Sequence, residues 1–275
     1  MAPRNDLADF LRARRAALQP ADVGLTPGPR RRTSGLRREE VALLANVSVS
    51  WYTWLEQGRP INASADVLHA LADALRLDAV ERNHLLTLSG QRAVAPVDSE
   101  RSDAPEAIVR FLQELMPAPA YVIGPTWNFL AWNNAFSTLY PRINTLVPSE
   151  RNLVWVVFGD SEARTLIADW NVEARRVLSQ FRAEIVSFQH EPAVSALIEH
   201  LRATSTEFAR WWPRHDVGGF ESHRREFQHP LAGYLQFETQ QLIPSGERDL
   251  RIVVHLPVHD DDSAQRLARV GNDSS

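Results

Sequence analysis

The sequence contains no cysteine among its 275 residues, so disulfide bonds and thiolate chemistry contribute nothing to its structure or activity. It also contains no apolar run long enough to span a bilayer, and its first residues lack the pattern of a secretory leader. These absences argue against a secreted or membrane protein, and we expect a cytoplasmic one. The length is sufficient for two domains of ordinary size.

Lysine is absent as well, and all 30 basic residues are arginine. Arginine favours two-point contacts with phosphate, although a codon bias towards G and C explains the same composition. The charge is uneven: residues 1–92 hold 13 arginines and 10 acidic residues, and the remainder holds 17 and 24. A basic N-terminal part on an acidic chain suits a nucleic-acid-binding domain joined to a domain with another task.

The segment 36–59 has the pattern of two helices joined by a tight turn. Two glutamates stand in the first turn of the first helix, at about residues 37–45, where negative charge is favourable. Asn46 suits the left-handed conformation that ends a helix, and Ser48 is a good N-cap for the next helix. Gly58 then ends the second helix. Because the turn is so short, the two helices must cross steeply.

The second of these helices is predicted to present a face that could enter a major groove. Its outward side chains are Val49, Ser50, Thr53, Trp54 and Gln57. Arginines just before and within the first helix could lie along a DNA backbone, although a solvated loop would look the same. The candidates for this role are Arg31, Arg32, Arg37 and Arg38. Since part of the groove face is apolar, we expect much of the affinity to come from phosphates or thymine methyl groups.

The segment 36–59 resembles the helix-turn-helix of Xre-type repressors. In that family the position of Arg38 often contacts phosphate or base, and the position of Glu56 often pairs with an arginine of the first helix, here Arg15. The sequence departs from the family at Asn46, where a turn glycine is usual, and in the apolar groove face. An ordinary helical hairpin with a charged face is the alternative interpretation.

The rest of the chain divides into two domains of different class. Five short helices precede residue 92: a first helix at about 6–19, the two helices of the motif, a fourth capped by Ser64 and a fifth ending before Gly90. A polar segment with little apolar content follows and is typical of a linker. The predicted parts are a helix-turn-helix domain 1–92, a linker 93–104, a second domain 105–260 and a C-terminal tail 261–275.

The second domain is predicted to be α+β, an antiparallel sheet with helices over one face. After a helix at 106–115, residues 121–136 indicate a strand, a tight turn, a strand and a helix capped by Asn133, an order that resembles the opening of a PAS domain. The further elements expected are helices at 163–187, 192–203 and 205–212 and strands at 223–229, 233–242 and 250–256.

Motifs spread over nearly the whole chain, from about Leu7 to Leu256, together resemble the MmyB-like transcriptional regulators. They are Arg31-Arg32-Thr33, the run from Gly35 to Glu40, Asp169-Trp170, Phe208, Trp212-x-x-His215-x-Val217 and His229-Pro230-x-x-Gly233. The resemblance implies an Xre-type five-helix bundle followed by a PAS-like domain that binds an apolar small molecule of fatty-acid type. We also expect a homodimer on double-stranded DNA, because one short helix reads too few bases for useful specificity.

Aromatic residues are the main candidates for a ligand site in the second domain, which holds six of the eight tryptophans. They could roof an apolar cavity, or they could fill a solid core. The candidate ligand-binding residues are Trp127, Trp132, Phe136, Trp170, Phe208, Trp212 and His215. The candidates to meet a ligand carboxylate, or else to form surface ion pairs, are Arg175, Arg176, His215 and Arg224.

Catalysis and metal binding are not indicated. His255 and His259 straddle Pro257, so they cannot share one helical turn, and no nucleophile elbow, phosphate loop or zinc-protease motif is found. We therefore expect a regulator that is not an enzyme, with no cofactor apart from a bound fatty acid. The alternative is a DNA-binding regulator whose C-terminal domain serves only protein interaction or dimerisation.

Overall fold

The computed structural model describes residues 3–26, 35–91, 101–186, 188, 191–247, 249–259 and 261–273. The chain forms two units, one of Met1–Ala95 with Trp211–Gly219 and the other of Pro96–Arg210 with Phe220–Ser275. None of the helices within the described residues has the length and apolar character needed to cross a membrane.

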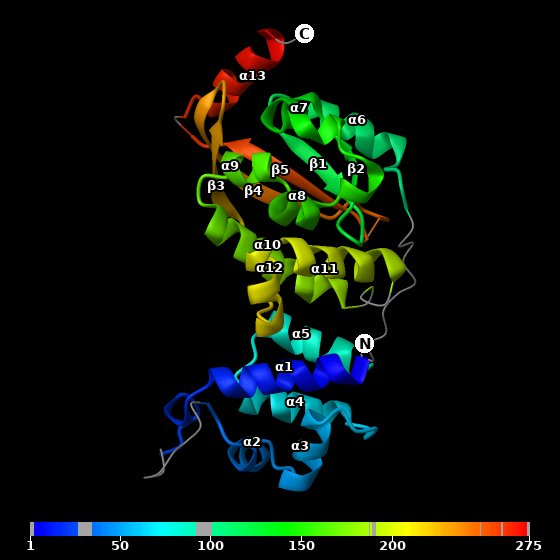
Figure 1. The fold of residues 1–275 in the computed structure, drawn as a ribbon, viewed down its shortest axis with the longest axis vertical. Coiled ribbons are helices and arrows are strands. Elements are labelled where there is room, and N and C mark those ends of the chain that lie inside the picture. The colour runs from blue at the N-terminus through cyan, green and yellow to red at the C-terminus, as the bar shows by residue number, and fades with distance from the viewer. Residues whose placement is uncertain are drawn as a thin grey trace. The chain divides into compact units, whose positions relative to one another are not determined.

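The first unit is a bundle of short helices, and its part before residue 92 is coloured blue to cyan in Figure 1. Its helices are α1 (Pro3–Ala17), the 3-10 helix η1 (Pro20–Val23), α2 (Arg38–Leu44), α3 (Val49–Glu56), α4 (Ala65–Ala74), α5 (Ala79–Leu88) and the later 3-10 helix η4 (Trp212–Arg214). Apolar side chains that are fully buried make its core: Phe10, Leu11, Leu68, Leu71 and Leu85. The predicted five-helix head is therefore confirmed.

Local signals in the sequence set the boundaries of these helices. Ser48 Oγ accepts a hydrogen bond from the Trp51 amide at 3.2 Å and begins α3. Ser64 Oγ accepts one from the Val67 amide at 3.4 Å and begins α4. Asn46 has a φ of +52°, so the chain turns between α2 and α3 in the left-handed conformation that its short polar side chain tolerates. The predicted caps and turn are confirmed.

The elements that follow along the chain form an antiparallel sheet with helices. They are α6 (Glu106–Glu114), β1 (Ala120–Ile123), β2 (Phe129–Trp132), α7 (Asn134–Leu139), η2 (Pro141–Asn144), η3 (Pro148–Glu150), α8 (Leu153–Gly159), α9 (Ser161–Leu166), α10 (Trp170–Ile185), α11 (Pro192–Thr204), α12 (Thr206–Trp211), β3 (His223–His229), β4 (Gly233–Leu242), β5 (Arg251–Pro257) and α13 (Ser263–Asp273). The strand order is β2-β1-β5-β4-β3, and all neighbours are antiparallel. This is the α+β arrangement that the sequence predicted.

Helices cover both faces of this sheet, whereas we expected them over one face. Successive side chains of a strand point to opposite faces. Val122 and Val254 pack with Leu112 of α6 in the core on one face. Tyr121 and His255 face α7, α8 and α9 on the other. The second face holds the candidate ligand site.

The helix predicted over 163–187 is wrong as a single element, because the chain breaks between α9 and α10. Ile167 is extended and pairs with Phe227 of β3. The Ala168 amide then donates to the Glu226 carbonyl at 3.0 Å. Helix α8 was not predicted, since its mostly β-branched and aromatic residues are more typical of strands.

Asn133 joins three elements of the second unit from a fully buried position. Its Oδ1 accepts hydrogen bonds from the Phe136 and Ala120 amides, both at 3.0 Å. Its Nδ2 donates to the Leu112 and Ala118 carbonyls, both at 2.9 Å. The predicted cap of α7 is confirmed, and the same side chain also holds α7 against α6 and β1.

Candidate DNA-binding surface and ligand cavity

Helix α3 presents a mixed face to solvent. Its exposed or half-buried side chains, with its C-cap, include all five that the sequence placed outward: Val49, Ser50, Thr53, Trp54 and Gln57. Val49 and Trp54 are 41% and 42% exposed. The Arg59 guanidinium lies 5.8 Å from the Trp54 ring centroid, so this indole carries a cation at its face. Such a surface can meet both thymine methyl groups and phosphates.

Beneath this face, Glu56 is fully buried and joins three helices. Its carboxylate accepts hydrogen bonds from Arg15 Nε of α1 at 2.5 Å and from Arg38 Nε of α2 at 2.7 Å. Burial alone would raise the pKa of Glu56, but its hydrogen bonds with Arg15, Arg38 and Tyr52 and the charge of Arg15 together hold the pKa below its usual value. The predicted pairing of Glu56 with Arg15 is confirmed, and the motif gains a fixed charge network.

Of the four arginines predicted to contact DNA, two lie within the described residues and two lie outside them. Arg38 gives its Nε to Glu56, yet 43% of its side chain is exposed, so the outer edge of the guanidinium can still meet a phosphate. Arg37 is exposed at the N-cap of α2. Arg31 and Arg32 lie outside the described residues.

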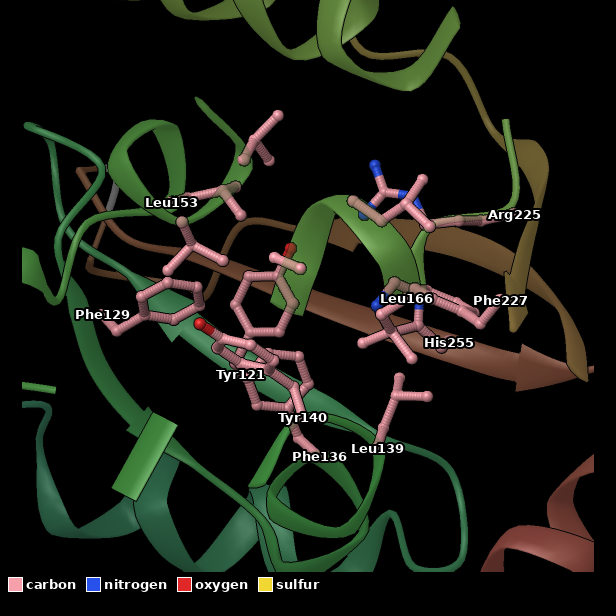
Figure 2. Close-up of a pocket in the computed structure, with 14 residues that line it drawn as sticks. Tyr121, Phe129, Phe136, Leu139, Tyr140, Leu153, Leu166, Arg225, Phe227 and His255 are labelled. Atoms are coloured by element: carbon pink, nitrogen blue, oxygen red, sulfur yellow. The ribbon is translucent and has the colours of Figure 1, made fainter. Parts of the chain in front are cut away.

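The second unit contains an apolar cavity between the sheet and the helices α7, α8 and α9 (Figure 2). The sheet contributes Tyr121, Phe129 and Phe227, and helices α7 to α9 contribute side chains such as Phe136 and Leu166. Its volume is about 50 Å³. Drug-sized ligands occupy pockets of ~300–1,000 Å³, so a long ligand must displace part of this lining.

Helix α9, which covers part of the cavity, is held in place by contacts at both of its ends. Asp160, at the junction of α8 and α9, accepts a hydrogen bond from the Tyr140 hydroxyl and pairs with Arg142 Nε at 3.1 Å. At the other end of α9, Ile167 pairs with Phe227 of β3. A ligand that enlarges the cavity therefore acts on α9, whose two ends are linked to residues at the end of α7 and to the sheet.

One polar side chain in the lining is buried and neutral. His255 is 1% exposed, and its Nδ1 lies 3.0 Å from the Thr239 hydroxyl. Burial, assisted by the charge of Arg225, holds its pKa well below the usual value. Among the residues that the structure describes, no cluster of histidine and acidic side chains could hold a metal ion.

Glu173 of α10 lies beside the cavity in a cluster of basic side chains. It is 6% exposed and accepts hydrogen bonds from Arg176, from Arg225 Nε at 3.0 Å and from His223 Nε2 at 3.1 Å. Burial alone would raise its pKa, but His223, Arg225 and Arg176 lower it to about 2. Among these four residues, Arg225 also lines the cavity.

Of the seven candidate ligand-binding residues, Phe136 lies in the cavity lining. Trp127 Nε1 donates to Glu184 at 2.9 Å, and Trp132 Nε1 donates to Asn144 at 3.0 Å. Trp170 and Phe208 each pack edge-on against the Phe158 ring. Trp212 and His215 belong to the first unit. For the Trp170 and Phe208 pair, the solid-core alternative describes the packing better than the cavity does.

Arg225 is not among the candidates predicted from the sequence, although a signal for it is present. The strand at 223–229 was predicted correctly, and alternation along a strand places Arg225 on the same face as the buried Phe227. The residues predicted to meet a carboxylate include its neighbour Arg224, which alternation places on the opposite face, and Arg176, which holds Glu173 from outside the lining.

A helix-turn-helix bundle joined to a PAS-like domain with an apolar cavity defines a transcription regulator with a DNA-binding and a ligand-binding domain. Family comparisons agree: residues 6–85 match the helix-turn-helix domain, and residues 104–270 match the MmyB-like transcription regulator ligand binding domain. The chain belongs to the MmyB-like transcription regulators, as its motifs predicted. No match was found among curated proteins.

Proposed function

We propose that the protein is a cytoplasmic, homodimeric regulator that reads operator DNA with α3 and binds an apolar small molecule of fatty-acid type, which modulates operator binding. The observation that carries the ligand part is the apolar cavity, whose lining ends at one charged side chain, Arg225. An apolar chamber with few polar groups is the usual construction of a small-molecule site. The domains are those of a regulator, and we expect no catalytic activity.

The DNA part of the proposal rests on α3 and the arginines beside it. A single short helix reads only a few base pairs, so two copies on a roughly palindromic site would supply the specificity, with half-sites about 34 Å apart. Arg38 would hold the phosphate backbone, while Ser50, Thr53 and Gln57 would meet base edges.

The size of the cavity supports a switch. Each buried methylene of a ligand contributes about 0.8 kcal/mol, but a cavity of about 50 Å³ must open to receive a chain of them. A ligand that binds an opened state better than the closed one shifts the population towards the opened state. The linked cover of α8 and α9 is the element that such a ligand would move.

Native mass spectrometry of the purified full-length protein tests the ligand proposal. We expect a co-purified lipid with the wild-type chain and its loss from Ala163→Phe, because Ala163 is buried in the cavity lining. Ala168→Phe is the matched control, since Ala168 is exposed five positions further along. A wild-type protein that neither carries lipid nor takes up added fatty acid would leave the C-terminal domain as an interaction module.

A further inference from the structure

Arg225 stands where the apolar cavity meets the charged cluster around Glu173. Figure 2 shows its guanidinium at one end of the chamber, with aromatic and aliphatic side chains filling the rest. A guanidinium carries five N–H donors in a rigid planar fork. Two of the Arg225 nitrogens, Nε and Nη2, lie 3.0 Å from the same oxygen of Glu173, Oε2. Glu173 therefore occupies only part of the fork.

The positive charge around Glu173 exceeds the single negative charge of its carboxylate. Both ring nitrogens of His223 face oxygen acceptors: Nδ1 lies 2.8 Å from the Glu221 carbonyl, and Nε2 lies 3.1 Å from the Glu173 carboxylate. These two contacts hold the imidazole beside the carboxylate. Arg176 and Arg225 place two guanidinium cations on this one carboxylate. The cluster has room for a second anion.

The cavity side of Arg225 is where that anion would lie. The side chain of Tyr121, another member of the lining, is almost fully buried, and the Arg225 charge acts on its hydroxyl. A hydroxyl and the outer edge of a guanidinium are the groups that bind a carboxylate by charge-assisted hydrogen bonds. The remaining lining is mostly apolar, which suits the chain of the same ligand.

We propose that Arg225, with the Tyr121 hydroxyl, binds the carboxylate of the ligand and makes the cavity select acids over uncharged molecules with the same chain. This inference rests on the proposed function, in which the cavity binds the apolar chain of a molecule of fatty-acid type. It assigns the specificity for the end group to one residue, Arg225, and leaves Glu173 as the partner that holds this arginine in place.

The test compares decanoic acid with 1-decanol, by isothermal titration calorimetry of the full-length protein at pH 8. The wild-type protein should bind the acid at least about 10-fold more tightly, since hydrogen bonds to a charged group are roughly twice as strong as neutral ones. Arg225→Met should bring the two affinities within about 3-fold of each other while decanol still binds. Arg176→Met is the matched control, because Arg176 also holds Glu173 but does not line the cavity, and it should keep the wild-type ratio.

The outcomes separate this inference from the function on which it rests. Equal wild-type affinities for acid and alcohol would overturn the carboxylate site and leave the apolar cavity in place. Binding of neither probe would overturn both. If Arg225→Met binds nothing because it misfolds, Arg225→Lys decides: it keeps the charge without the fork, so it should retain a reduced preference for the acid, and equal affinities would refute the proposal.

Discussion

Arg15 of α1 donates a hydrogen bond of 2.5 Å from its Nε to Oε1 of Glu56. The Glu56 carboxylate is fully buried at the end of α3. Arg15 also donates to the Leu36 carbonyl at 2.7 Å, just before α2 begins. One arginine therefore fixes the first helix of the bundle against both helices of the motif. The orientation of α3 depends on this pair.

Glu56→Gln should destabilise the first unit by about 3–5 kcal/mol, because it leaves the Arg15 charge buried against a neutral side chain. Differential scanning calorimetry of the full-length protein measures the effect. Glu39→Gln is the control: Glu39 is exposed in the first turn of α2, and its loss should cost less than about 1 kcal/mol. Equal thermograms for the two variants would show that the buried pair does not hold the motif.

Asn133→Ala should destabilise the second unit by roughly 2–5 kcal/mol, because four buried backbone groups lose their partner. Asn133→Asp keeps the acceptor oxygen but loses both donors, so it should also be destabilised. Urea unfolding followed by tryptophan fluorescence measures both. Asn134→Ala, at the exposed next position, should behave like the wild type, and similar losses at 133 and 134 would contradict the central role of Asn133.

The stability that Glu173 supplies should depend on pH. Its pKa is lowered in the folded protein from 4.5 to about 2, so its contribution is complete above pH 4.5 and is lost as the pH falls towards 2. The shift corresponds to roughly 3 kcal/mol.

Urea unfolding of the wild type and of Glu173→Gln, repeated from pH 7 down to pH 2, follows this contribution. The gap between the two proteins should be largest at neutral pH and should narrow below pH 4.5. Glu162→Gln, which changes an exposed carboxylate, provides the control. A gap of constant size over the whole range would mean that the ionised form of Glu173 contributes nothing.

Arg38→Ala should weaken binding to operator and unrelated DNA alike and should flatten the salt dependence, as expected for the loss of one phosphate contact. Ser50→Ala offers the contrast, since an exposed residue of α3 that meets a base edge should change the preference at one position and leave the salt slope unaltered. Fluorescence anisotropy at several salt concentrations, with sites selected from a random DNA pool, distinguishes the two. An Arg38→Ala variant with an unchanged slope would remove the phosphate assignment.

Much of the fold could be predicted because its signals are local. Asn46, Ser48 and Ser64 each set a boundary through their own conformation or side chain, and all three act in the structure as the sequence indicated. Glu56 could be paired with Arg15 only through the family resemblance, since nothing local to either residue points to the other.

The features that were predicted wrongly, or not at all, depend on contacts between distant parts of the chain rather than on local signals. The break before α10 follows from the pairing of Ile167 with Phe227 of β3, far away in the sequence. The partner of the Trp127 indole, Glu184, is equally remote, so composition could not show that this tryptophan lies outside the lining. The exception is Arg225, which strand alternation could have revealed.

The most direct test of the whole account is the operator affinity of the full-length protein with and without a saturating long-chain fatty acid. If occupation of the cavity changes the regulator, the dissociation constant of the wild-type protein should change by at least about fivefold, equivalent to ~1 kcal/mol of coupling. Ala163→Phe, with its cavity filled, should show no change. Identical binding curves for the wild-type protein, with fatty acid binding demonstrated in the same samples, would contradict the account.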